Sequence, residues 1–94
     1  MTEAMLVTIL DEVQAKREGA ERVMPDGRRV TLYAAHNGVG LTIGKVASMT
    51  IENGLVRARN DKGETYILAL DDVYAASVEA GSTGPSARKA GFVG

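Results

Sequence analysis

The chain of 94 residues contains no cysteine, which excludes disulfides, thiolate metal sites and cysteine nucleophiles. Aromatic residues make up only 4% of it, so stacking surfaces are scarce. No apolar run approaches the ~18 residues of a membrane span, and Glu3 stands where a secretory signal would carry positive charge. The formal net charge is −1, so the charge of the whole chain does not indicate nucleic-acid binding. We therefore expect a soluble, cytoplasmic protein without a membrane partner.

The sequence also lacks a constellation of catalytic or metal-binding groups. His36 is the single histidine, and its position beside Asn37-Gly38 predicts an exposed turn residue. Asp71 and Asp72 are adjacent and would face opposite sides of a strand, so a turn is expected there. No nucleophile, base and orienting group occur together. We expect no enzyme activity, no metal site and no cofactor.

A single domain is expected from the length, with three parts along the chain. Residues 1–19 predict an N-terminal helix packed on the rest of the domain, capped by Thr2 and ended by Gly19. Apolar residues recur there at three- and four-residue steps, namely Met5, Leu6, Ile9, Leu10 and Val13. Residues 28–79 predict a small β-barrel, reached through a linker. Residues 80–94 predict a flexible tail, since they are rich in Gly, Ser, Ala and Pro.

Turn signals divide the barrel region into short strands. The strongest signals are Asn37-Gly38 and Asn53-Gly54, because a type I′ turn needs positive φ at both positions. The strand between them is long, and Gly44 inside it predicts a sharp bend. The segment from Thr65 to Leu70 is nearly all apolar and is expected to be covered on both faces. The predicted class is mainly β: an N-terminal α-helix followed by a five-stranded, strongly bent antiparallel barrel.

This layout is that of small SH3-like barrels, and one subclass fits best. Val30-Thr31-Leu32-Tyr33, followed by Asn37-Gly38 and then by Leu41, Gly44 and Val46, resembles the first motif of the Sm-like family, whose bacterial members are RNA chaperones. The resemblance covers about half of the chain. It implies a ring of copies in which the fourth and fifth strands of neighbouring subunits pair. The residues that such an interface would use here are Tyr66, Leu68, Val73 and Tyr74.

Arginines at alternate positions are the best candidates for ligand contact. Arg57 and Arg59 are predicted on one face of a short strand, and Lys45, Arg28 and Arg29 are candidates to join them in a phosphate-binding face. The alternative is that these cations only keep a β-surface soluble.

Two functions stay open at this point. The first is a self-associating Sm-like protein that contacts RNA through a basic face built by the ring. The second is an SH3-like module that docks a protein partner, with no nucleic-acid role. The near-neutral charge favours the second, as does Tyr66-Ile67-Leu68 at the place where the bacterial family holds uridines with a Tyr-Lys-His run.

Overall fold

Helix α1 (Glu3–Glu12) is shorter than the sequence predicts. It ends because Gln14 adopts a left-handed backbone conformation with φ 61°, and the amide of Ala15 donates to the carbonyl of Leu10 at 3.0 Å. This is the Schellman closure of a helix, a position usually held by glycine. Gly19, the expected stop, therefore lies beyond the end of the helix, in the turn of a β-hairpin.

The structure, a computed structural model, describes residues 1–79 of the chain, and the predicted tail, residues 80–94, lies outside it. Seven strands occur in this part, namely β1 (Lys16–Glu18), β2 (Glu21–Val23), β3 (Arg29–His36), β4 (Val39–Glu52), β5 (Leu55–Asn60), β6 (Thr65–Ala69) and β7 (Val73–Glu79). A short 3-10 helix, η1 (Leu70–Asp72), precedes β7. The prediction of a mainly β chain with one N-terminal helix is confirmed.

The predicted count of five strands is wrong. Residues 16–23, expected to be the end of the helix and a linker, form the hairpin β1–β2 instead. The inner strand of this pair, β2, adds to the edge of β4, with Val23 opposite Ser48 and Glu21 opposite Thr50. Such short charged strands carry little signal of their own, because the pairing partner lies more than twenty residues further along the chain.

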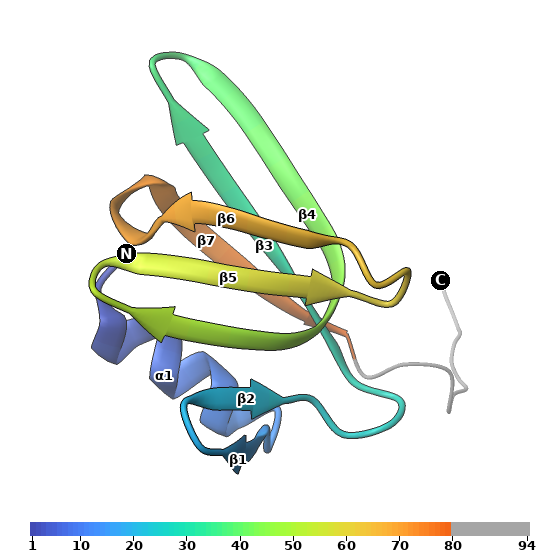
Figure 1. Cartoon of the computed structure of the whole chain (residues 1–94). Coiled ribbons are helices and arrows are strands. Elements are labelled where there is room, and N and C mark those ends of the chain that lie inside the picture. Colours follow the sequence, from blue (N-terminus) through green and yellow to red (C-terminus); the bar gives the residue numbers. More distant parts are fainter. Residues whose placement is uncertain (80–94) are drawn as a thin grey trace.

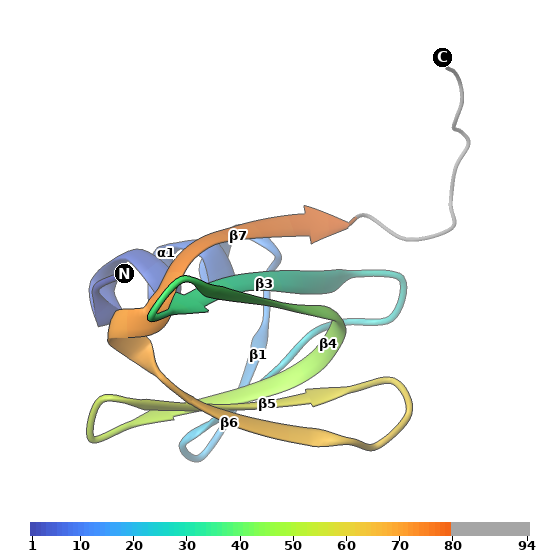
Figure 2. The same cartoon turned by 90° about the horizontal axis from the view of Figure 1, so that it is seen from above.

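The seven strands form one antiparallel sheet that is not closed into a barrel. β4 is its centre: it pairs with β3 and β2 along one edge and with β5 along the other, while β7 adds to β3 and β6 adds to β5. Figure 2 shows the resulting bend, with β7 and β3 in one layer, β5 and β6 in another, and β4 crossing between them. The β3–β4 hairpin projects beyond the other strands (Figure 1). β6 and β7 are both edge strands.

The two Asn-Gly turns are confirmed. Asn37 and Gly38 have φ values of 51° and 82°, and Asn53 and Gly54 have values of 53° and 76°. His36 pairs with Val39 across the first turn, so the loop has two residues, as a type I′ turn requires.

The bend of β4 is carried by a different residue from the one expected. Lys45 has a φ of 56°, whereas Gly44 is not among the residues with positive φ. The pairing of β4 with β3 is irregular at the same place: Val46 lies opposite Val30, but Ile43 lies opposite Leu32. β4 thus contains a bulge, and bulges increase the local twist of a sheet.

The core lies between the two layers and beneath α1. Leu6, Leu10 and Val13 of the predicted helical stripe are buried in it, but Met5 is 56% exposed. The sheet contributes alternate residues of its strands, namely Val30, Leu32, Ile43, Val46, Met49, Val56, Ala58 and Val73. Their opposite neighbours face outward, which is the alternation that the sequence predicts for β3 and β5.

Candidate functional site

Of the three strands in residues 1–79 that pair along one edge only, β1, β6 and β7, the last two expose large apolar side chains. β6 pairs only with β5, and β7 pairs only with β3, so each has one edge whose backbone amides and carbonyls have no strand partner within residues 1–79. β6 contains no charged residue and no proline, the two devices that usually protect such an edge. Exposed apolar side chains accompany both strands: Ile67 is 60% exposed on β6, and Tyr74 is 66% exposed on β7.

The structure separates the four residues that the sequence assigns to a subunit interface. Tyr74 is exposed and lies against Tyr33, with ring centroids 6.4 Å apart and ring planes at 42°. Tyr66 and Leu68 are half-buried against the core. Val73 is fully buried, because it pairs with Ala34 and shares its inward face. The side chain of Val73 is therefore unavailable to a partner.

Ile67 was missed because β6 was expected to be covered on both faces. That expectation is wrong: no element of the described chain covers the outer face of β6, and Ile67 points there. The residues from Tyr66 to Leu70 are all apolar, so no alternation of polar and apolar residues marked Ile67 as the exposed one. Val78 at the far end of β7 is also exposed.

An apolar cavity of about 420 Å³ lies between the projecting β3–β4 hairpin and β6. Its apolar lining includes Val39, Leu41 and Leu68. At its rim, the Nδ1 atom of His36 lies 3.1 Å from Oδ1 of Asp72. His36 is exposed, as predicted, and Asp72 lies in η1 rather than in a strand. The lining of the cavity is mainly apolar, with the contact between His36 and Asp72 among its polar groups.

Arg57 and Arg59 lie on the outward face of β5, as the sequence predicts. Neither forms an ion pair within residues 1–79. Their cross-strand neighbours on β6 are Ile67 and Thr65. The two guanidinium groups are thus free to meet an anion, and they border the exposed side chain of Ile67.

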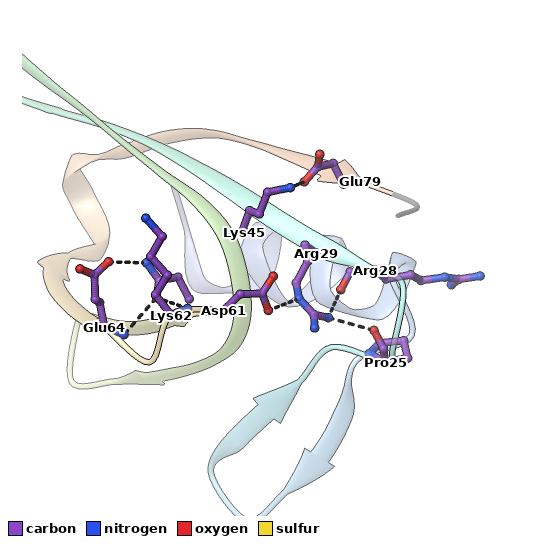
Figure 3. Close-up of polar contacts among 9 residues, drawn as sticks. Pro25, Arg28, Arg29, Lys45, Asp61, Lys62, Glu64 and Glu79 are labelled. Atoms are coloured by element: carbon purple, nitrogen blue, oxygen red, sulfur yellow. Dashed lines mark hydrogen bonds and ion pairs between the residues drawn. The ribbon is translucent and has the colours of Figure 1, made fainter. Parts of the chain in front are cut away.

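The other three candidate cations contact the chain itself, and Figure 3 shows the contacts of two of them, Arg29 and Lys45. Arg28 Nη1 donates to Oε1 of Gln14 at 2.9 Å. Arg29 is held more tightly, with Nε donating to Oδ1 of Asp61 at 2.7 Å. Arg28 and Arg29 therefore each have a hydrogen-bond partner within the chain, whereas Arg57 and Arg59 form no ion pair within residues 1–79.

Lys45, the fifth candidate, lies beside the β5–β6 loop, where charges of both signs alternate. Its Nζ atom lies 3.9 Å from a carboxylate oxygen of Glu79. Glu64 accepts a hydrogen bond from Nδ2 of Asn60 at 2.8 Å. That bond, with smaller contributions from Tyr66 and Lys62, lowers the pKa of Glu64 below its ordinary value. The carboxylate therefore stays charged at neutral pH, and this loop does not form a basic site.

The described residues contain no group of three or more His, Asp or Glu side chains placed to hold a metal ion. Within the same residues, no helix has the length and apolar character needed to cross a membrane. Comparisons with protein-family models, with curated proteins and with solved structures give no match. They identify no Sm-like family for this chain.

Proposed function

We propose that this chain is a non-enzymatic binding module of the Sm-like type whose copies associate edge to edge. The observation that carries the proposal is the open sheet, with apolar residues exposed on both of its unpaired edge strands. The pairing order β6–β5–β4–β3–β7 is the order expected of a five-stranded small barrel, and β1–β2 is then an addition to it. In this reading, the gap between β6 and β7 is filled by the strands of neighbouring copies.

The association is of the head-to-tail kind, because β6 and β7 are different surfaces of the same chain. Such contacts generate a ring when the rotation between copies closes. Covering the remaining exposed surface of a side chain such as Ile67 or Tyr74 contributes about 1–2 kcal/mol each, in addition to the backbone hydrogen bonds of the added strand. Pairing also removes an exposed apolar edge, which otherwise promotes aggregation.

Light scattering tests the proposal directly. The wild-type chain should have a stable mass several times its 9.9 kDa, near five to seven times if the Sm-like resemblance extends to ring size, at both low and high salt. Ile67→Lys and Tyr74→Lys should each reduce the mass to that of a monomer. Met5→Lys is the matched control, since Met5 is equally exposed but lies on α1. A monomeric wild-type chain at high concentration would overturn the proposal.

RNA is a candidate ligand of the assembled copies. The observation that favours it is that Arg57 and Arg59 form no ion pair within residues 1–79. A ring would repeat these two unpaired cations in every subunit. Binding of a labelled RNA should then weaken with salt, because phosphate contacts release counterions. The double variant Arg57→Ala with Arg59→Ala should lose binding, whereas Lys16→Ala with Arg17→Ala, which removes the same charge from β1, should keep it. Equal binding by both variants, or none by wild type at low salt, would exclude this role.

A protein partner is the alternative to RNA, and the apolar cavity beside β6 favours it. A monomeric chain without RNA binding would leave the free edges and this cavity as a docking surface for another protein. In that case, Leu41→Lys at the cavity would be the variant that abolishes binding in a partner assay, with Met5→Lys again as the control.

A further inference from the structure

Two Asn-Gly pairs with the same backbone conformation occur in this chain, and the fold holds them differently. Asn37-Gly38 and Asn53-Gly54 each form a two-residue turn with positive φ at both positions, and all four residues are exposed. Asn-Gly is a dipeptide prone to spontaneous deamidation, because glycine has no side chain to shield its backbone amide. The two turns therefore offer the same chemistry in two structural settings.

The turn at Asn53-Gly54 is held by contacts outside its own hairpin. The next residue, Leu55, pairs with Ala69 of β6. The amide of Leu70, at the start of η1, donates a hydrogen bond to the carbonyl of Gly54 at 2.8 Å. Opening this turn therefore requires that these contacts break as well.

The turn at Asn37-Gly38 lacks such support, because it lies at the end of the projecting β3–β4 hairpin (Figure 1). β7 pairs with β3 only as far as Ala34, and within residues 1–79 the strand residues of the segment 35–40 pair only with one another. The side chain of His36 lies 3.1 Å from Asp72, but an exposed contact of this kind stabilises weakly. The tip of the hairpin is therefore free to open while the rest of the sheet stays paired.

We propose that Asn37 is a site of spontaneous deamidation and that the fold protects Asn53. The backbone nitrogen of Gly38 loses its proton to a solvent base and attacks Cγ of Asn37, Nδ2 leaves as ammonia, and a succinimide ring forms. Water then opens the ring at either carbonyl and gives aspartate or isoaspartate, so the net reaction consumes water and releases ammonia. Ring closure rotates the backbone of Asn37 out of the turn conformation, and its rate therefore follows the opening of the turn. This inference does not rest on the proposed self-association.

The two products change the tip of the hairpin in different ways. Aspartate is compatible with the turn, since Asp-Gly is also favoured there, but it adds a negative charge to the lining of the apolar cavity, which includes Asn37 and Asp72. Isoaspartate adds a methylene group to the backbone, so the loop between His36 and Val39 no longer has the length of a type I′ turn. Deamidation of Asn37 therefore alters the cavity as the protein ages.

Peptide mapping of the full chain tests the proposal. Trypsin separates the two sites, because residues 30–45 contain Asn37 as their single asparagine and residues 46–57 contain Asn53. The chain is incubated at mildly alkaline pH, and mass spectrometry measures the converted fraction of each peptide over time. Asn37 should convert at least about five-fold faster than Asn53, since one hydrogen bond changes an opening equilibrium about two- to ten-fold and the second turn also has a paired strand beside it.

Urea separates the effect of the fold from that of the neighbouring residues. In the unfolded chain the two sites should convert at similar rates. Equal rates in the folded chain, or faster conversion of Asn53, would overturn the proposal. A difference that persists unchanged in urea would assign it to the sequence rather than to the fold and would overturn the proposal as well.

A disulfide across the hairpin tests whether opening of the tip controls the reaction. Ala35 lies opposite Gly40, and opposed strand residues lie about 4.5–5.5 Å apart between Cα atoms, which suits a disulfide. In the double variant Ala35→Cys with Gly40→Cys, whose thiols are unique because the chain has no native cysteine, oxidation should slow conversion of Asn37 to the level of Asn53, and reduction should restore it. Conversion of Asn53 is the matched control and should stay constant. If Asn37 converts equally fast with and without the disulfide, its reaction does not depend on opening of the hairpin, and the proposal is wrong.

Discussion

Replacing Lys45 with glycine should stabilise the fold, although it removes a charged residue from the middle of β4. The φ of Lys45 is 56°, and this left-handed conformation costs a residue with a Cβ about 1–2 kcal/mol. Glycine avoids that cost but adds about 0.4–1 kcal/mol of unfolded-chain entropy. The ion pair to Glu79 is long and exposed, so its loss costs a few tenths of a kcal/mol at most. The free energy of unfolding should rise by about 0.5 kcal/mol.

Two further variants isolate the backbone effect. Lys45→Ala loses the same ion pair but keeps the left-handed conformation, so it should be about 1 kcal/mol less stable than Lys45→Gly. Gly44→Ala tests the neighbouring position, which the sequence favours as the bend. Its φ is not positive, and nothing lies within 4 Å of an added Cβ. Gly44→Ala should therefore be neutral or stabilising by up to about 1 kcal/mol.

Thermal and urea unfolding at one fixed protein concentration measure these differences, because assembly makes the melting temperature depend on concentration. A change of 0.5 kcal/mol corresponds to about 2–4 °C for a domain of this size. The reasoning would be refuted if Gly44→Ala lost more than about 1 kcal/mol while Lys45→Gly was no more stable than Lys45→Ala. That result would place the left-handed residue at Gly44.

Three other predictions follow from single residues. Gln14→Gly should be about 1 kcal/mol more stable to urea than Gln14→Ala, because Gln14 closes α1 at a φ of 61°; equal stabilities would contradict the Schellman closure. Val73→Ala should lower the free energy of unfolding in urea by about 2 kcal/mol and leave the assembling surface unchanged. Tyr74→Ala should instead change the mass measured by light scattering more than it changes the free energy of unfolding. Glu64 has a lowered pKa, so its contribution to stability is present above the pKa of the unfolded chain and is lost as the pH falls. Glu64→Gln should therefore lose less stability than wild type between about pH 6 and pH 3, and parallel losses in urea midpoint would refute the role of its hydrogen bond to Asn60.

Local signals in the sequence predicted the parts of the fold that depend on neighbouring residues. Asn37-Gly38 and Asn53-Gly54 form the expected turns because few other residues accept positive φ twice in succession. Alternation likewise placed Arg57 and Arg59 outward. The end of α1 was missed because Gln14, a residue with no preference for the left-handed region, supplies the closure.

The parts of the fold and of the candidate site that depend on contacts between distant residues could not be predicted from the sequence. β2 forms because it pairs with the edge of β4, and its short charged sequence contains no signal that predicts this pairing. Arg29 looked free for phosphate, but its partner Asp61 lies 32 positions away. Arg28 likewise meets Gln14, 14 positions away. The candidate basic face was reduced by contacts that only the folded chain reveals.

Because a single copy has few unpaired cations, the proposed assembly must precede the proposed binding of RNA. A single copy offers two unpaired arginines on β5, and two phosphate contacts give a salt slope of only about −1.4 on a single strand. Steep salt dependence and tight binding therefore require several copies, and the copies are joined through β6 and β7 rather than through arginines. Ile67→Lys adds a positive charge beside Arg57, so simple electrostatics would strengthen RNA binding by a monomer. If RNA binding requires assembly, the same variant should abolish binding. Whether its affinity for a labelled RNA rises or is lost therefore distinguishes binding by a monomer from binding by an assembly.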